Sequence, residues 1–209
     1  MRFYISDLHF FHDDLNKNMD MRGFESVEAM NSYMIEQWNK KVRKNDETVI
    51  LGDFSMGKTA QTEEILNALN GKKYMIIGNH DRFLSDKKFD TSLFKWIEPY
   101  KEVKDDKRRV ILCHYPIFCY KGQYHVDDKG EPKTYMLYGH VHNTYDEVLV
   151  NSFQNITRNA LRPEFHDEPE KGRIPCQMIN CFCMFSDYTP LTLDEWIEVD
   201  ARRRTEMSG

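Results

Sequence analysis

The fold can be inferred from Met75-Ile76-Ile77-Gly78-Asn79-His80-Asp81, where a short apolar run ends at a glycine and passes directly into chemically active side chains. An apolar run of this length is typical of a buried strand. The frequencies of the residue types predict a chance Gly-Asn-His only about 0.02 times in a chain of this length. The sequence therefore indicates a strand that delivers functional groups at its carboxyl end.

Further apolar runs resemble this one. The strand candidates cover residues 2–6, 48–51, 73–77, 110–113, 135–138 and 177–179, and 100–103 with 108–113 resembles a hairpin. Apolar residues at steps of three and four predict helices over 27–42, around 65–69 and over 146–161. Thr192 and Glu195 form a capping box at which a last helix should begin. Strands that alternate with helices predict an α/β fold.

The side chains that follow these strands are carboxylates, imidazoles and amides. They are Asp7 with His9, Asp53, Asn79 with His80 and Asp81, His114, His140 with His142, and Asn180. Open α/β sheets gather ligands at the carboxyl ends of their strands. One such side chain alone is more often a polar cap that bonds to the backbone. Their recurrence at successive strand ends favours a metal site instead.

The donor types indicate which metals this site would bind. Oxygen and imidazole donors without a thiolate suit Mn²⁺, Fe, Zn²⁺ or Co²⁺, and the set exceeds the four ligands that one tetrahedral ion uses. We therefore expect two divalent ions per chain, with one carboxylate shared between them. Mn²⁺ is the first expectation, and Fe, Zn²⁺, Ni²⁺ and Co²⁺ are the alternatives. Two metal ions bound side by side in this way activate a water for attack on phosphorus.

Composition limits the class of protein. A chain of 209 residues with 40% hydrophobic residues is expected to form one domain over 1–209. Its apolar runs are far shorter than the roughly 20 residues of a membrane span, and the amino terminus does not resemble an export signal. The five cysteines contain no Cys-x-x-Cys pair and are expected to be reduced thiols. We expect a cytoplasmic protein that does not contact membranes.

Charge and polar segments add two expectations. The net charge of -5 argues against binding along a long nucleic-acid track, although the basic cluster at 107–109 leaves a local contact with nucleic acid or a nucleotide open. The polar, glycine-containing segment 121–133 predicts a loop. Proline and charge at 162–173 predict a surface excursion, placed within about 144–175.

The motifs, in chain order, are Asp7-x-His9, Gly52-Asp53, Gly78-Asn79-His80-Asp81, His114 and Gly139-His140-Val141-His142. In this order they resemble the motifs of the calcineurin-like metallophosphoesterases. The closest likeness is to the small, single-domain members of bacterial and phage type. The resemblance implies a four-layer αββα sandwich, in which two mixed β-sheets are flanked by helices.

The resemblance also implies a role for each motif residue. The first metal would bind Asp7, His9 and His142, the second would bind Asn79, His114 and His140, and Asp53 would bridge them. His80 would be the general acid at the leaving-group oxygen. At the rim, Asn79, His12 and Tyr115 are expected to contact substrate.

Two departures from the family pattern bear on the substrate. Ser/Thr phosphatases of the family carry an acid three residues after the bridging Asp, followed by an Arg, whereas this chain has Met56 and Gly57. Asp81 is then the nearest acid able to orient His80. Without a motif Arg to hold a dianion, a phosphodiester is favoured mildly over a phosphomonoester.

The function predicted from the sequence is hydrolysis of one of these phosphate esters by metal-activated water. A non-catalytic metal-binding scaffold of the same fold and a nuclease are the alternatives. The sequence leaves the oligomeric state open.

Overall fold

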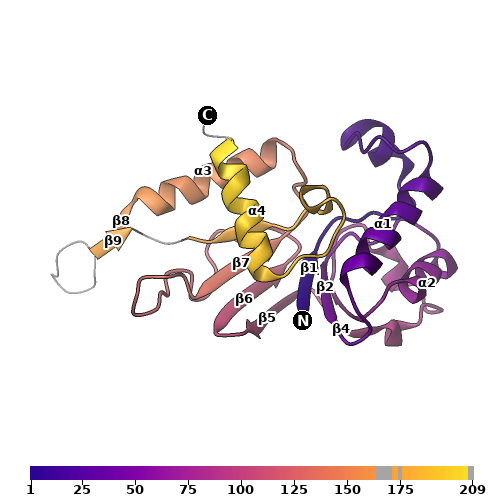
Figure 1. Ribbon diagram of the computed structural model, residues 1–209, viewed down its shortest axis with the longest axis horizontal. Coiled ribbons are helices and arrows are strands. Elements are labelled where there is room, and N and C mark those ends of the chain that lie inside the picture. The colour runs from indigo at the N-terminus through magenta and orange to yellow at the C-terminus, as the bar shows by residue number, and fades with distance from the viewer. Residues whose placement is uncertain (163–170, 174–175, 207–209) are drawn as a thin grey trace.

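The computed structural model describes residues 1–162, 171–173 and 176–206, and its core is two four-stranded sheets (Figure 1). The first sheet has the order β1-β2-β3-β4, and these strands pair parallel throughout. Its strands are β1 (Arg2–Ile5), β2 (Glu47–Leu51), β3 (Lys72–Ile76) and β4 (Phe94–Glu98). An antiparallel bridge from Leu191 to Tyr4 adds the opposite direction at the β1 edge.

The second sheet has the order β10-β7-β6-β5 and is mixed. Its strands are β5 (Tyr100–Asp105), β6 (Arg108–Cys113), β7 (Thr134–Tyr138) and β10 (Met178–Asn180). The pairs β10 with β7 and β7 with β6 are parallel, whereas β5 and β6 form an antiparallel hairpin. The hairpin predicted from residues 100–103 and 108–113 is therefore confirmed.

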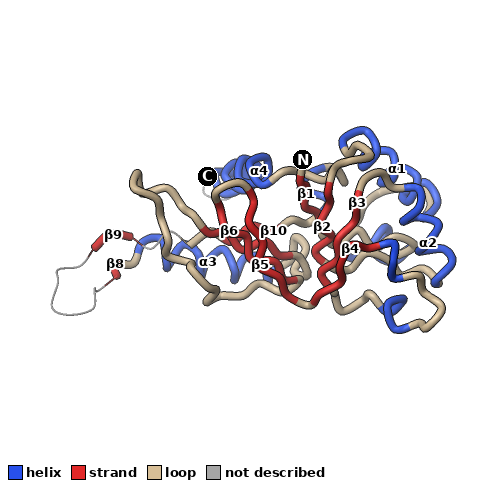
Figure 2. Tube along the Cα trace, turned by 90° about the horizontal axis from the view of Figure 1, so that it is seen from below, coloured by secondary structure: helices blue, strands red, loops and turns tan. Residues whose placement is uncertain are grey.

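Helices cover the outer faces of both sheets. The helices α1 (Val27–Lys41) and α2 (Thr59–Ala68) lie on one side of the strands and α3 (Tyr145–Asn159) lies on the other (Figure 2). Buried Met34 and Leu66 of the first two helices share a core with Ile50 of β2. Val150 of α3 packs with Met136 of β7. The predicted four-layer α/β sandwich is confirmed.

A separate apolar layer joins the two sheets. It combines Val49 and Leu51 of β2 with Leu112 of β6 and Leu137 of β7. These side chains alternate along each strand with those that face the helices, as the pleat requires. The inner layer therefore fixes how the carboxyl ends of the two sheets lie against each other.

The last helix, α4 (Leu193–Glu206), spans the edge where β1 and β10 meet. Trp196 Nε1 donates to the carbonyl of Tyr4 at 2.8 Å, and the ring is fully buried. Thr192 N–H donates to Glu195 Oε2 at 2.9 Å, and Glu195 N–H donates back to Thr192 Oγ1 at 3.3 Å. The predicted capping box is confirmed.

Short elements complete the described chain. They are a π-helix (Leu15–Met19), 3₁₀ turns (Arg82–Ser85, Thr91–Leu93 and Cys183–Ser186), and the two-strand pair β8 (Leu161–Arg162) with β9 (Lys171–Arg173). Residues 163–170 and 174–175 of the predicted excursion lie outside the described residues. The predicted loop at 121–133 is confirmed, with one bridge between Val126 and Pro132. Among the described residues, no helix has both the length and the apolar character that crossing a membrane requires.

Candidate metal centre

The candidate site lies at the carboxyl ends of strands from both sheets. Asp7 and Asp53 follow β1 and β2, His114 follows β6, and His140 follows β7. Several of these residues have a left-handed backbone, which costs a non-glycine residue free energy and is common at functional sites. Their φ angles are 55° at Asp7, 49° at His9, 53° at Asp53, 71° at His140 and 47° at His142. The fold thus accepts local strain to turn these side chains toward one another.

Two glycines are required by how closely the strand ends approach. A Cβ on Gly78 would lie 2.3 Å from Oδ1 of Asp53, and a Cβ on Gly139 would lie 2.4 Å from Oδ2 of Asp7. Neither position can hold a side chain without displacing a carboxylate. The glycines of both motifs therefore serve to bring two strand ends into contact.

One group of candidate ligands consists of Asp7, His9 and His142, all buried. One donor atom from each lies within 4.8 Å of the others. The Nε2 atoms of His9 and His142 are 3.2 Å apart, and His142 Nε2 is 3.5 Å from Oδ1 of Asp7. The N–H of His140 donates to the same Asp7 oxygen at 2.9 Å, which holds the carboxylate in place.

A second group consists of Asp53, His114 and His140, under the same distance criterion. Asn79 joins it, because its Oδ1 is 3.0 Å from His114 Nε2. Oδ2 of Asp53 is 3.3 Å from Nε2 of His114 and 3.5 Å from Nε2 of His9. A single carboxylate oxygen therefore faces both groups.

Burial and charge together shift the pKa values in this cluster. Burial opposes ionisation of Asp7, but the hydrogen bond to His142 and the nearby histidines hold its pKa well below the usual range. Burial lowers the pKa of His9 to about 3. Burial also opposes the charged form of His114 and His142, yet hydrogen bonds to Asp53, and to Asp20 and Asp7, raise both pKa values to about 9.

These donors fit divalent metal ions. Carboxylate, amide and imidazole donors converge in two buried groups whose Nε2 and Oδ atoms face one another at 3.0–3.5 Å. Hard oxygen and imidazole nitrogen are the ligands that Mn²⁺, Fe, Zn²⁺ and Co²⁺ accept in mixed sites. The predicted metal ligands are thus brought together as two groups with one shared carboxylate.

Comparison with known proteins agrees with this geometry. Residues 3–173 match the family model described as calcineurin-like phosphoesterase. The chain belongs to the calcineurin-like phosphoesterases. Members of this family are generally metal-dependent hydrolases of phosphate esters, and the resemblance stated from the motifs is confirmed.

Several individual proteins are similar to this calcineurin-like phosphoesterase. The uncharacterized protein MJ1445 of Methanocaldococcus jannaschii is 42% identical over 83 residues, which are 39% of this chain and 47% of that protein. The Gene 66 protein of Mycobacterium phage D29 is 38% identical over 82 residues, which are 38% of this chain and 39% of that protein. The chain thus matches less than half the length of these relatives.

A solved structure shares the fold. It is the crystal structure of the protein of unknown function AQ665 from Aquifex aeolicus, with a TM-score of 0.65 and 21% sequence identity. The similarity covers 95% of this chain and 98% of that one. At this identity the likeness supports the architecture alone.

Three further predicted residues border the ligand groups. The rings of His80 and His12 each lie 5.5 Å from the ring of His9, and Nδ1 of His80 is buried without a hydrogen-bond partner among the described residues. The exposed Tyr115 has its ring 4.5 Å from that of His140, and its hydroxyl is 3.5 Å from Oδ1 of Asn79. All three residues therefore lie next to the candidate metal ligands, where they could contact a bound substrate.

Asp81 does not take the place expected for an acid that orients His80. Its carboxylate accepts from the N–H groups of Asp53, Phe54 and Gly78 at 2.7–3.0 Å. Burial raises its pKa to about 7, against these hydrogen bonds. Asp81 therefore holds the turn after β2 against the turn after β3, and among the described residues no hydrogen bond joins its carboxylate to His80.

Asn180 ends its strand but does not join the ligands. Its Nδ2 donates to the carbonyl of His142 at 2.8 Å and to Oε2 of Glu147 at 3.1 Å. Glu147 is buried and also accepts from the hydroxyl of Tyr138 at 2.9 Å. Asn180 thus supports the loop that carries His142.

Two residues at the site were missed by the sequence analysis, namely Asp20 and Arg22. Oδ1 of Asp20 is 2.8 Å from Nδ1 of His142, and Arg22 pairs with Asp20 at 2.9 Å. An acid two residues before an arginine in a polar segment is usually solvent-exposed. Only the burial of both side chains distinguishes this pair, and burial of a polar segment has no periodic signal in sequence.

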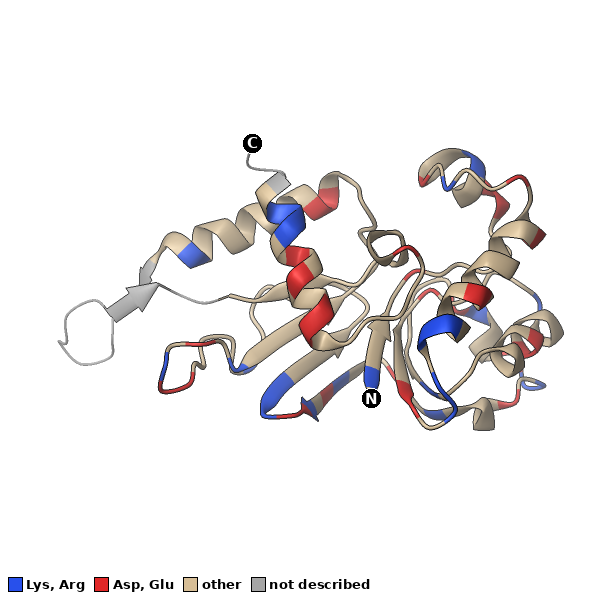
Figure 3. Ribbon diagram, viewed as in Figure 1, with Lys and Arg blue, Asp and Glu red and all other residues tan. Residues whose placement is uncertain are grey.

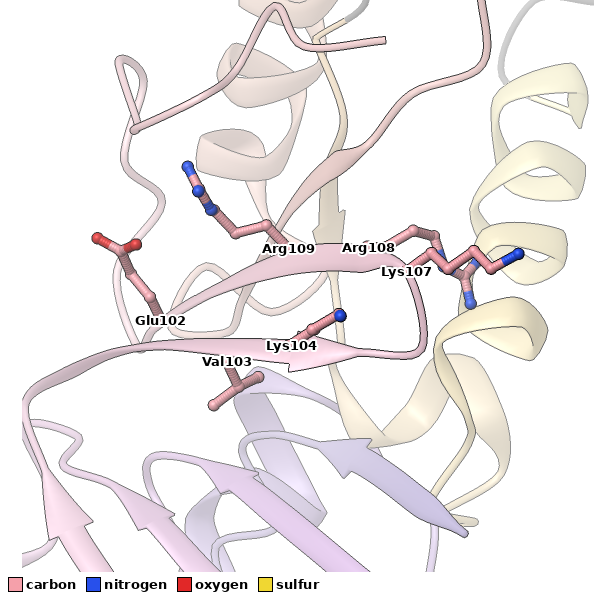
Figure 4. A pocket seen from close by; sticks show the side chains of 6 residues that line it. All are labelled: Glu102, Val103, Lys104, Lys107, Arg108 and Arg109. Carbon is pink, nitrogen blue, oxygen red and sulfur yellow. The ribbon is translucent and has the colours of Figure 1, made fainter. Parts of the chain in front are cut away.

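The basic cluster at 107–109 lies at the turn of the β5–β6 hairpin, where Figure 3 shows Lys and Arg in blue, and this turn is away from the candidate metal ligands. Lys107, Arg108 and Arg109 border a pocket at the turn of the β5–β6 hairpin (Figure 4), and His114 follows the other end of β6. Six residues of strand separate the two ends by about 20 Å. Arg108 is already paired with Asp194 at 2.5 Å. A nucleic acid held at this turn would not be held at the candidate site.

Proposed function

We propose that this calcineurin-like phosphoesterase is a dinuclear enzyme that hydrolyses phosphodiesters in preference to phosphomonoesters. The observation that carries the proposal is the position of Asp53, whose Oδ2 faces His9 of one ligand group and His114 of the other at 3.5 and 3.3 Å. A single oxygen between two groups of donors is what a bridged pair of ions requires.

The ligand assignment follows the two groups. Asp7, His9 and His142 would hold the first ion, Asn79, His114 and His140 would hold the second, and Asp53 would serve both. When bound, the two divalent ions would polarise the phosphoryl group and supply a nucleophilic water. We propose Mn²⁺ as the native metal, with Fe, Zn²⁺, Ni²⁺ and Co²⁺ as alternatives, because the donors are oxygen and imidazole nitrogen.

His80 is proposed to protonate the leaving-group oxygen. Its backbone N–H donates to Oδ1 of Asp53 at 2.8 Å, so its position is tied to the shared carboxylate. Its ring lies beside that of His9, and Nδ1 has no hydrogen-bond partner in the described chain. An imidazole that lies beside the proposed metal ligands, with a ring nitrogen that makes no other hydrogen bond, is suited to general acid catalysis.

Tyr115, Asn79 and His12 are proposed to contact the substrate. Tyr115 and Asn79 are exposed, the Tyr115 ring lies beside that of His140, and the His12 ring lies next to that of His9. None of the three carries a fixed positive charge, which suits a singly charged diester better than a dianion. That balance supports the preference for a diester.

The two alternatives receive less support. A scaffold without turnover would not need an unpartnered His80 beside an intact set of ligands. A nuclease would need phosphate contacts near the ligands, whereas the predicted basic cluster lies at the far end of β6.

All five cysteines are free thiols, which supports the proposed cytoplasmic location.

The test combines metal content with substrate preference. Purified protein loaded with Mn²⁺ should contain two ions per chain by elemental analysis and should hydrolyse bis-p-nitrophenyl phosphate with a higher kcat/KM than p-nitrophenyl phosphate. A parallel series with Zn²⁺, Ni²⁺ and Co²⁺ ranks the metals. A single ion per chain would contradict the dinuclear assignment, and a strong preference for the monoester would contradict the substrate class.

A further inference from the structure

We infer that the buried pair Asp20 and Arg22 positions the ligands of the first metal ion and has no equivalent role at the second. The inference rests on the proposed two-metal assignment. Asp20 and Arg22 lie in the segment that precedes α1, and their side chains are 3% and 0% exposed. Charges buried to this degree are costly unless each finds partners, so the contacts of this pair define its role.

Asp20 orients His142. A carboxylate can only accept, so the 2.8 Å contact from Oδ1 of Asp20 places the proton of the neutral imidazole on Nδ1. Nε2 of His142 then presents its lone pair toward Asp7 and His9. A carboxylate behind a histidine ligand fixes the tautomer and the ring orientation that metal binding requires.

Arg22 holds the turn that carries the other two ligands. Its Nη2 donates to the carbonyl of Asp7 at 3.0 Å, and its Nη1 donates to the carbonyl of Leu8 at 2.7 Å. Asp7 and His9 on either side of Leu8 have left-handed φ angles of 55° and 49°. A guanidinium with a fixed fork of donors can stabilise two successive carbonyls of such a turn, which a lysine cannot do.

The two side chains act together. Nε and Nη2 of Arg22 both donate to Oδ2 of Asp20, at 3.0 and 2.9 Å, while Oδ1 of Asp20 faces His142. One ion pair therefore connects His142 with the turn at Asp7 and His9, although His142 lies 122 residues from Asp20 in the chain. All three proposed ligands of the first ion depend on it.

The second ion is supported differently. Nδ1 of His114 lies 2.8 Å from the carbonyl of Leu51, a backbone group at the end of β2. Asp53 is fixed by the N–H of His80. In the described part of the chain, the contacts of Asp20 and Arg22 do not include Asn79, His114 or His140. Loss of the pair should therefore weaken one ion and leave the other.

The experiment measures Mn²⁺ binding to metal-free protein by calorimetry and elemental analysis for the wild type, Asp20→Asn, Asp20→Ala and Arg22→Lys. Asp20→Ala should lower the Mn²⁺ affinity of one of the two positions by about 10- to 100-fold, which is the usual cost of removing such a partner. Asp20→Asn should lose less, because its amide oxygen can still accept from Nδ1. Arg22→Lys should also weaken a single ion, because one ammonium cannot reproduce both carbonyl contacts.

Asp200→Asn is the matched control. It removes the negative charge from another largely buried aspartate–arginine pair, Asp200 with Arg204 at 2.7 Å in α4, and should leave both ions bound. Melting temperatures of the metal-free variants separate general destabilisation from loss of a ligand position, and the electron paramagnetic resonance spectrum should change from coupled to isolated Mn²⁺ only in the Asp20 and Arg22 variants. Equal weakening of both ions, or of neither, would overturn the inference. A wild type that binds fewer than two ions would instead overturn the dinuclear assignment.

Discussion

Replacing Asp53 by Asn tests the bridge between the two ligand groups. Asn is nearly isosteric, and its amide oxygen can still accept from the N–H of His80, so the fold of the turn should survive. The change removes one negative charge that faces both His9 and His114 at 3.5 and 3.3 Å. At about 4 Å and an effective dielectric constant near 20, one pair of unit charges interacts by about 4 kcal/mol. Because Mn²⁺ carries two charges, this energy is a lower estimate, and we expect each Mn²⁺ to bind at least about a thousandfold more weakly.

His142→Ala is the comparison for that prediction, because His142 belongs to the first group alone. It should reduce the bound Mn²⁺ from two ions to one, whereas Asp53→Asn should weaken both. Calorimetric titration of metal-free protein, checked by elemental analysis after gel filtration, distinguishes the two patterns. If the Asp53→Asn protein held two ions at wild-type affinity, the assignment of Asp53 as the bridge would be wrong.

Three further changes test other parts of the site. His80→Ala should keep its metal but lose about 10²- to 10⁴-fold in kcat on a diester with an alkoxide leaving group. The loss should be far smaller on a p-nitrophenyl ester, whose p-nitrophenolate leaves without a proton, and equal losses would remove His80 from the acid role. Mn²⁺ affinity should rise with pH up to about 9, because the raised pKa values of His114 and His142 make protons compete with metal below that pH. Calorimetry in two buffers should show proton release on binding, and an Mn²⁺ affinity that does not change with pH would contradict the prediction. Gly78→Ala should lower metal content and destabilise the fold by about 1–3 kcal/mol, because its Cβ would lie 2.3 Å from Oδ1 of Asp53; unchanged metal content and urea midpoint would show that the turn can relax.

The sequence alone predicted the strands and the gathering of the candidate ligands at their carboxyl ends, and the reason is local, whereas the layers followed from the family resemblance. Short apolar runs followed by glycine specify where each strand ends, and parallel strands bring their carboxyl ends to one edge. Asp7, Asp53, Asn79, His114 and His140 could therefore be grouped before their separations were known. The capping box at Thr192 was equally predictable, since both of its partners lie within one turn of helix.

Contacts between distant loops were decided by the tertiary structure. The sequence offered Asp81 as a partner of His80 because the two are adjacent, but packing of two turns directs its carboxylate to the backbone at Asp53, Phe54 and Gly78. The strand register likewise places the basic residues 107–109 at the end of β6 opposite His114.

Asp20 and Arg22 show most clearly why such contacts escape a reading of the sequence. They lie in a segment without hydrophobic periodicity, and their partners are a histidine 122 residues away and two backbone carbonyls. Charged side chains on a loop are normally solvated, so the pattern of residue types predicts exposure. This pair is buried, and contacts the candidate metal ligands, only because its loop folds against the end of β1.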